Sequence, residues 1–563
     1  MVRDELIEIL PFVRRPGRYI DREINSIKKD LNKIGLKFAL AFPDLYEVGM
    51  SHLGLQILYS ILNNHPDVAC ERVFSPEMDM EVMMRERGMP ISSLESSLPL
   101  REFDLIGFSL QYELSYTNVL NIIDLAGIPF YSRDRDDDST SFIAMSYPLI
   151  IGGGPLSLNP EPIADFFDLF LLGDGEDAVL EVADVLLKGK GDGLKKGDLL
   201  RELSRIEGVY VPSYFDVRYA KDGSIDEIVP LMSDYKKVRR RVLKDLDKAI
   251  VPDRPIVPYL NVIHDRLSLE VARGCTRGCR FCQAGFTYRP VRERSPETIF
   301  NAIRDILKNT GYEEVSLLSL STGDYSCIQE LIIRLMDYLH PDRVALSFPS
   351  LRVNSVSPLF MEQVKRVRKT GFTIAPEVGT DRLRKVINKD VDEEKLLNTA
   401  RWVFEAGWKA IKLYFMIGLP TEEDDDLKGI ADLSRKVFNS GKSGRTTVKV
   451  NLSTFIPKAH TPFQWYPQIT AEETMRKRGI IMKWGRARGL EFKTDDPDKG
   501  LLEGVFSRGD RRLSRVIHKA YSLGCRLDGW REHFRPDLWQ EAFKASGLEP
   551  AFYIHRHRDT GEC

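Results

Sequence analysis

The sequence has few cysteines, little net charge and no long apolar run. Seven cysteines in 563 residues are too sparse for a disulfide scaffold. No run of 18 apolar residues occurs, so no membrane span is expected. A net charge of −2 provides no global basic field for nucleic acid. The first ten residues carry three acidic side chains and do not resemble a signal peptide. The sparse cysteines predict a reduced, cytoplasmic protein, and the length of 563 residues predicts two to four domains.

Three of the cysteines are concentrated in one short loop. Cys275, Cys279 and Cys282 have the spacing C-x3-C-x2-C, and glycines at 274, 278 and 285 allow tight folding around a bulky group. Cysteine sulfur is the ligand of iron–sulfur clusters. A four-iron cube held by three sulfurs keeps one iron open for a small molecule. The preceding residues 267–272 predict a strand, so the loop begins at a strand end, where α/β barrels place their chemistry.

This loop resembles the signature of the radical S-adenosylmethionine (SAM) enzymes, with Phe281 as the aromatic residue before the third cysteine. The resemblance implies a 4Fe–4S cluster whose open iron binds SAM, and reductive cleavage of SAM to a 5′-deoxyadenosyl radical. It also implies an external electron donor of the flavodoxin or ferredoxin type. A zinc site is the alternative, but zinc usually takes four ligands and no fourth Cys or His is near in sequence.

The first third of the chain alternates short apolar strands with helices. Strands are predicted at 36–42, 105–109, 149–154 and 169–173, with helices near 115–126 and 176–187. This alternation predicts an α/β, Rossmann-like, doubly wound parallel sheet. Ligands of such sheets lie outside the carboxyl ends of the strands.

Residues at those strand ends resemble a cobalamin-binding domain over about 36–190. The methionine-synthase-type pattern is Asp-x-His-x-x-Gly, then Ser, then Gly-Gly, and here Tyr46 stands at the position of the cobalt-ligating His. Many cobalamin-dependent radical SAM enzymes also lack that His. The resemblance implies cobalamin contacts at Asp44, Tyr46, Gly49, Ser109, Gly152, Gly153, Gly173 and Glu176.

Two alternatives bear on this domain. His52 is a second candidate for the cobalt ligand, although its position favours the following helix. The whole domain could also be a Rossmann-like fold that has lost its cofactor, since glycines equally serve tight turns.

From 267 to about 456 a second strand–helix alternation occurs. Six strands are predicted at 267–272, 315–320, 344–348, 372–375, 410–417 and 448–456. They fit the partial (β/α)6 barrel of radical SAM enzymes, which is open at one side.

Four segments at these strand ends resemble the SAM-contacting segments of that family. Thr322-Gly323-Asp324 resembles a Gly-Gly-Glu motif for the SAM ammonium, with Asp in place of Glu, and Arg352 is expected to pair with the SAM carboxylate. The remaining two segments imply ribose and adenine contacts at Glu377, Gly379 and Thr380, and at Ile417, Gly418 and Pro420.

The expected domains are a helical lead-in (1–35), the cobalamin-binding domain (36–190), a connector (191–265), the barrel (266–456) and a small α-rich extension (457–563). The connector contains the basic run 235–244, a solvated face or an RNA-contacting strip. Arg508, Arg511 and Arg512 are candidates for a substrate anion or for internal ion pairs. The tail, with Arg508-Gly-Asp-Arg-Arg512 and Trp530, resembles an uncharacterised family of cobalamin-binding radical SAM proteins.

Three functions are compatible with this sequence. The first is a cobalamin-dependent radical SAM methyltransferase that acts on an unactivated carbon. The second is a non-methylating radical SAM enzyme, for rearrangement, ring formation or RNA modification, in which cobalamin is auxiliary or absent. The third is a cluster or cobalamin sensor without catalysis. The sequence does not identify the substrate, and RNA is one candidate.

Overall fold

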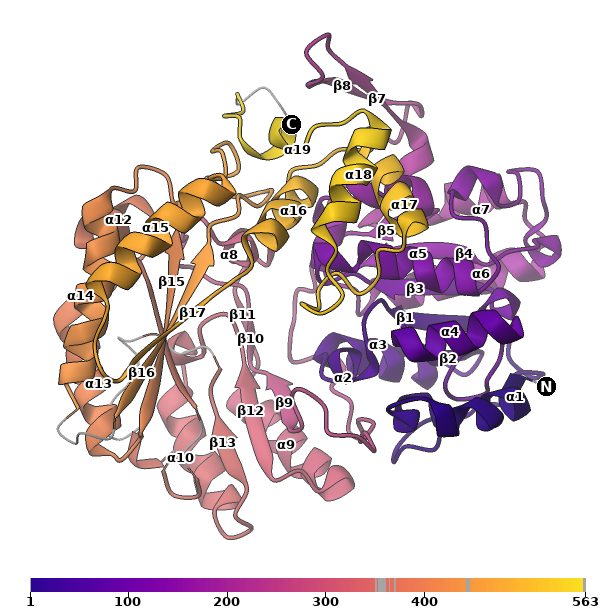
Figure 1. Ribbon diagram of the computed structural model, residues 1–563. Helices are drawn as coiled ribbons and strands as arrows, with labels where there is room; N and C mark the ends of the chain where they lie inside the picture. Colours follow the sequence, from indigo (N-terminus) through magenta and orange to yellow (C-terminus); the bar gives the residue numbers. More distant parts are fainter. Residues whose placement is uncertain are drawn as a thin grey trace.

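The computed structural model describes residues 2–349, 352, 361–363, 365–368, 371–441 and 446–559. An N-terminal α/β domain and a second strand-rich domain lie side by side, and the C-terminal helices lie above their junction (Figure 1). Within the described residues, no helix is both long and apolar enough to cross a membrane.

The N-terminal domain is built on one six-stranded sheet. Its order is β2-β1-β3-β4-β5-β6, and all neighbours are parallel except β5 and β6. The strands are β1 (Leu36–Phe42), β2 (Val68–Phe74), β3 (Leu105–Ser109), β4 (Leu149–Gly153), β5 (Leu169–Leu171) and β6 (Val209–Tyr210). The chain direction across the sheet therefore reverses between β1 and β3, the switch point where doubly wound folds bind ligands. The predicted Rossmann-like sheet is confirmed, and it continues past residue 190.

Helices cover both faces of this sheet. Strand β1 shows why: Phe38 and Leu40 enter one buried core, whereas Ala39 and Ala41 enter the core on the opposite face. Helices of this region are α1 (Val2–Ile9), α2 (Tyr46–Gly49), α3 (Leu53–Asn64), α4 (Met78–Arg87), α5 (Tyr116–Leu125), α6 (Ala178–Gly191) and α7 (Lys196–Leu203). A β7–β8 hairpin (Phe215–Tyr219 and Ile225–Pro230) follows and projects from the top of the molecule (Figure 1).

The second domain contains two parallel sheets. One has the order β13-β12-β9 and the other β14-β15-β16-β17, and no pairing joins the two among the described residues. The strands are β9 (Leu267–Glu270), β12 (Glu314–Leu318), β13 (Ala345–Ser347), β14 (Phe372–Glu377), β15 (Ala410–Ile417), β16 (Thr447–Thr454) and β17 (Leu490–Thr494). All six predicted strands are present in an open barrel, and β17 is an additional seventh.

The helices between these strands have clear sequence boundaries. For α9 (Pro296–Thr310), the Ser295 hydroxyl accepts a hydrogen bond from the Thr298 amide at 3.2 Å, and Gly311 ends the helix with φ +72°. Its companions are α8 (Gln283–Thr287), α10 (Ile328–Leu339), α12 (Asp381–Val386), α13 (Glu393–Glu405), α14 (Asp424–Asn439) and α15 (Ala471–Trp484). A small antiparallel ribbon, β10 (Ala272–Arg273) with β11 (Arg292–Glu293), flanks the cysteine loop.

The last four helices pack on the N-terminal domain. They are α16 (Pro497–Ser507), α17 (Leu513–Leu523), α18 (Pro536–Ser546) and α19 (Pro550–Ile554). Phe506, Val516 and Trp539 belong to the same buried core as Phe108 and Tyr116. Helices α16–α19 are therefore a structural part of the N-terminal domain, whereas α15 and β17, which also lie within the predicted extension 457–563, belong to the second domain.

Candidate functional site

The three loop cysteines lie between β10 and α8. The Cys282 thiol caps α8 by accepting the Gly285 amide at 3.3 Å, and the Cys275 thiol accepts the Arg277 amide at 3.5 Å. All three thiols are half-buried. Burial raises the pKa of Cys279 and of Cys282, and charge on the neighbouring loop thiols raises both further. The three sulfurs are therefore close enough to interact electrostatically.

This donor chemistry fits an iron–sulfur cube. All three donors are cysteine sulfurs, the ligand type of such clusters. The described residues contain no group of three His, Cys, Asp or Glu side chains arranged around one metal ion. A cube is bound differently from a single ion, because each sulfur takes a separate iron atom.

Two cations lie beside the thiols. Burial raises the pKa of the Cys279 thiol, whereas Lys389 and Arg352 oppose that rise. Lys389 also pairs with Glu377 at 2.7 Å, and Arg352 donates to the Asp390 carbonyl at 3.3 Å. Arg352 was predicted from the sequence, but Lys389 was not. Its position after a helix end gives no local signal, and only the fold brings it to the cysteines.

Gly323 and Asp324 lie in a short turn after β12 and face the same loop. Arg277 Nε donates to Asp324 Oδ2 at 2.9 Å, its second nitrogen binds the other oxygen, and the Ser321 hydroxyl donates at 2.7 Å. Although burial raises the pKa of Asp324, these donors hold it below its usual value. The carboxylate predicted to meet the SAM ammonium is thus engaged by an arginine of the cysteine loop.

The segment at the end of β14 begins with the charged residue Glu377, and Gly379 and Thr380 after it have structural roles. Glu377 adopts φ +69°, a conformation uncommon outside glycine, and its carboxylate meets Lys389. A Cβ at Gly379 would lie 2.1 Å from the Ile430 amide nitrogen, so only glycine allows α14 this close. The Thr380 hydroxyl accepts the Leu383 amide at 3.4 Å as the α12 cap and also binds an α14 carboxylate.

The segment after β15 is a tight turn. Ile417 is fully buried, and Gly418 has φ +83° and donates its amide to Glu422 at 2.9 Å before Pro420. Phe281 packs against the buried core that contains Leu419. These residues keep the cysteine loop against the barrel, and their SAM contacts remain predictions.

A cavity of about 400 Å³ lies between the two domains. It begins at the ends of β3, β4 and β5 and extends beside Phe38 of β1 and Gly107 of β3, at the switch point. Five predicted cobalamin contacts line it, namely Ser109, Gly152, Gly153, Gly173 and Glu176. A Cβ at Gly153 would have no atom within 4 Å, so this glycine opens the cavity.

The other three predicted cobalamin contacts lie outside the lining. Tyr46 is 2% exposed and its hydroxyl donates to Glu23. Asp44 accepts the Trp530 indole N–H at 2.8 Å, and Gly49 packs against Phe74. Burial raises the pKa of Asp44. Tyr46 and Gly49 therefore pack within the N-terminal domain, and Asp44 joins it to the segment between α17 and α18.

His52 lines the cavity as the cap of α3. Its Nδ1 accepts the Leu55 amide at 3.2 Å. Burial lowers the pKa of His52 to about 4, so the ring is neutral at physiological pH. In a neutral ring whose Nδ1 accepts, the proton resides on Nε2.

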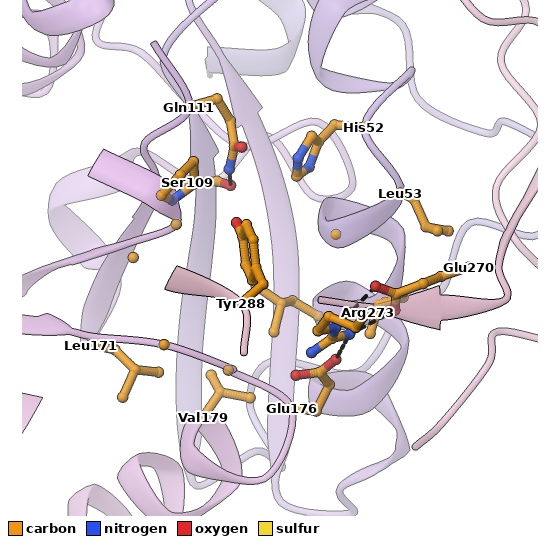
Figure 2. A pocket seen from close by; sticks show the side chains of 18 of the residues that line it. His52, Leu53, Ser109, Gln111, Leu171, Glu176, Val179, Glu270, Arg273 and Tyr288 are labelled. Carbon is orange, nitrogen blue, oxygen red and sulfur yellow. Dashed lines mark hydrogen bonds and ion pairs between the residues drawn. The ribbon is translucent and has the colours of Figure 1, made fainter. Parts of the chain in front are cut away.

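Tyr288 and Arg273 bring the second domain into the cavity wall. Figure 2 shows the Tyr288 ring directed into the cavity, with its hydroxyl toward Ser109 and Gln111. Arg273 meets Glu176 at 2.5 Å across the domain boundary. Neither residue was predicted, because each requires the relative position of the two domains.

The arginines of the tail are used internally. Arg511 pairs with Glu161 at 2.9 Å and Arg512 with Asp510 at 2.6 Å. Arg508 donates to the backbone carbonyls of Tyr466 and Arg556. Arg511 and Arg512 therefore form the internal ion pairs that were one of the two predicted alternatives, and Arg508 forms internal hydrogen bonds to the backbone.

Comparisons with known proteins agree with this architecture. The family "Radical SAM proteins, N-terminal" matches residues 54–212, and "Radical SAM superfamily" matches residues 269–434. An uncharacterized protein of Methanocaldococcus jannaschii is 28% identical over 85% of this chain and 90% of its own length. The ribosomal protein uS12 methylthiotransferase RimO of a Thermotoga species is 25% identical over 40% of this chain and 54% of that protein.

Among solved structures, the fold is similar to the radical S-adenosylmethionine methyltransferase TsrM of Kitasatospora setae, which was determined with cobalamin and a [4Fe-4S] cluster bound. The TM-score is 0.50 at 13% identity, and 76% of this chain and 77% of that chain are covered.

Proposed function

Because the chain belongs to the radical SAM superfamily, we propose that it is a cobalamin-dependent methyltransferase that acts on an unactivated carbon. Cys275, Cys279 and Cys282 would hold the 4Fe–4S cluster. The cluster and SAM supply the 5′-deoxyadenosyl radical, and a methylated corrinoid supplies the methyl group. An external reductant is required, and the substrate class stays open, with RNA among the candidates.

One observation carries the cobalamin part of this proposal: a single cavity is bounded by both domains. Strand ends of the N-terminal sheet form one side, and Ala272, Arg273, Gly274 and Tyr288 around the cysteine loop form the other. A substrate held there would face both cofactors. The fold of TsrM, a methyltransferase with cobalamin bound, supports the same assignment.

The residues of the cavity have distinct roles in this proposal. Gly153 leaves room for a flat macrocycle at the strand ends, whereas a Cβ at Gly152 would meet the Phe170 ring at 2.5 Å and is excluded by core packing. The space beside Phe38 and Gly107 would accept a long ligand tail along the sheet. The apolar walls exclude water from the reacting carbon. The Ser109 hydroxyl, which accepts from Gln111 at 3.0 Å, can still donate to a ligand.

The test uses protein purified without oxygen from cells supplied with cobalamin. We expect about four irons and one corrinoid per chain, and 5′-deoxyadenosine after addition of SAM and reductant. A Gly153→Leu variant should lose the corrinoid and retain the iron, because its side chain fills the cavity. Gly191→Leu is the matched control, since a Cβ there also meets nothing within 4 Å but lies outside the cavity lining.

Each outcome separates the candidate functions. A product heavier by one methylene supports the methyltransferase. Deoxyadenosine with corrinoid but without methyl transfer supports a non-methylating radical SAM enzyme. Corrinoid retained at wild-type level in Gly153→Leu would place any cobalamin elsewhere and overturn the cavity assignment.

A further inference from the structure

Arg273 connects the cysteine loop to the opposite domain. It is the last residue of β10 and stands two positions before Cys275. Its guanidinium meets Asp174 at 2.9 Å and Glu176 at 2.5 Å, both in the N-terminal domain. It also pairs with Glu270 of its own domain at 2.8 Å. Figure 2 shows the side chain between Glu176 and Glu270. One side chain therefore joins two domains at the edge of the cavity.

Asp174 fixes the other end of this connection. Its second oxygen accepts Arg292 at 2.5 Å and the Leu243 amide at 2.8 Å. Burial raises the pKa of Asp174, but Arg273 and Arg292 outweigh burial and keep the carboxyl ionised. The carboxylate is 3% exposed, so solvent screens these pairs weakly. Asp174 is thus held by three separate segments of the chain.

The acidic residues belong to the cavity wall itself. Gly173, Gly175 and Glu176 line the cavity on one side, and Arg273 and Gly274 line it on the other. A ligand that contacts residues 173–176 therefore contacts the segment that forms the ion pairs with Arg273.

The backbone after Arg273 transmits its position to the first cysteine. Gly274 has φ +92°, and a Cβ there would lie 2.6 Å from the Tyr288 carbonyl and 2.7 Å from that of Pro290. The chain has no free space at this point, so a displacement of Arg273 displaces Cys275. An arginine suits this role because its planar fork can meet several carboxylates in fixed geometry, which a lysine cannot.

We propose that Arg273 is a positioning residue that couples corrinoid binding in the cavity to assembly of the cluster on the cysteine loop. The inference rests on the proposed function, because it assigns the cavity to a corrinoid. The coupling is mutual: the cluster strengthens corrinoid binding, and the corrinoid strengthens cluster binding by the same factor. A purely structural ion pair would change the stability of the fold without linking the two sites.

The experiment measures hydroxocobalamin affinity by anaerobic absorbance titration, with the cluster reconstituted and with the cluster removed. In the wild type we expect the cluster to lower the dissociation constant by about fivefold or more, the lower range for coupled sites. In Arg273→Lys we expect less than a twofold difference, with iron content unchanged. Arg511→Lys is the matched control, since the Arg511–Glu161 pair is similarly buried but outside the cavity lining.

A second variant tests the coupling by a change in the N-terminal domain. Asp174→Asn leaves every residue of the cysteine loop intact, and we expect it to abolish the coupling and the change that corrinoid makes in the EPR spectrum of the reduced cluster. Wild-type coupling retained in both variants, or a wild type that binds corrinoid equally with and without cluster, would overturn the inference while leaving the proposed function standing. A wild type that binds no corrinoid would overturn both.

Discussion

Arg277 occupies the carboxylate that SAM is predicted to use. Both oxygens of Asp324 are bound by its guanidinium, with Nε to Oδ2 at 2.9 Å. If the SAM ammonium takes the position that the guanidinium holds at Asp324, it displaces this arginine. Arg277→Gln removes the competing charge and keeps a polar, although shorter, side chain. We therefore expect this variant to bind SAM more tightly than the wild type.

The size of this expected change in SAM affinity follows from the solvent exposure of the Arg277–Asp324 ion pair. The side chains of Arg277 and Asp324 are 43% and 29% exposed, so solvent screens their attraction. Such pairs contribute about 0.2–1 kcal/mol, and the dissociation constant of SAM should fall by roughly 1.4- to 5-fold. Asp324→Asn should act in the opposite direction, because a hydrogen bond to a charged group is worth about 1.5–3 kcal/mol. Its affinity for SAM should fall by roughly 10-fold or more.

Equilibrium titration of SAM into anaerobically reconstituted protein measures both effects, with iron content determined in each sample. Arg280→Gln is the control from the same loop, since Arg280 donates to the Val386 carbonyl at 2.6 Å whereas Arg277 donates to Asp324. Weaker SAM binding in Arg277→Gln with intact iron would refute the competition and indicate that Arg277 itself contacts SAM.

Three further predictions follow from the site. Neither wild-type protein nor His52→Gln should show imidazole nitrogen splitting in the EPR spectrum of bound cob(II)alamin. Nδ1 of His52 is committed to the helix cap, and Nε2 carries the proton, so neither nitrogen is free to bind cobalt. Splitting that is present in the wild type and lost on mutation would contradict this. Asp44→Asn should raise the melting temperature at pH 7, and this gain should vanish toward pH 4. Burial raises the pKa of Asp44, so ionisation of the folded protein costs stability as the pH rises. The amide oxygen of the variant still accepts the Trp530 indole N–H. Gly379→Ala should destabilise the fold by about 1–3 kcal/mol in denaturant unfolding through its clash with α14, whereas Gly371→Ala, with open space at its Cβ, should not.

Strand prediction succeeded where strands are continuous apolar runs and failed at β2. Strands β1 and β3 match their predicted bounds because nearly every residue is apolar and buried. Strand β2 contains Glu71 and Arg72 in a fully buried segment. Arg72 pairs with Glu95 at 2.7 Å and with Glu23, so its charge is satisfied inside the protein. Such pairing depends on distant residues and leaves no hydrophobic pattern.

The candidate site shows the same division. Sequence patterns located the ends of the predicted strands to within two residues, and five of the eight predicted cobalamin contacts line one cavity. They could not show that Tyr46 turns toward Glu23, or that the Asp44 carboxylate binds Trp530 nearly five hundred residues later. Cavity residues such as Tyr288 were missed because they come from the opposite domain. Local motifs identify positions, whereas side-chain directions depend on tertiary partners.

Two crossings of the chain between the domains explain how the proposed cofactor sites can be aligned in advance. The connector carries the chain from the N-terminal domain into the barrel, and after β17 helices α16–α18 return to the N-terminal core through Phe506 and Trp539. A domain joined by two crossings has less freedom to rotate than one joined by a single linker. The Arg273 pairs fix a third point beside the cavity. Three separated attachments restrict rotation about any single hinge. The relative placement of the cysteine loop and the sheet switch point is therefore a property of the folded chain.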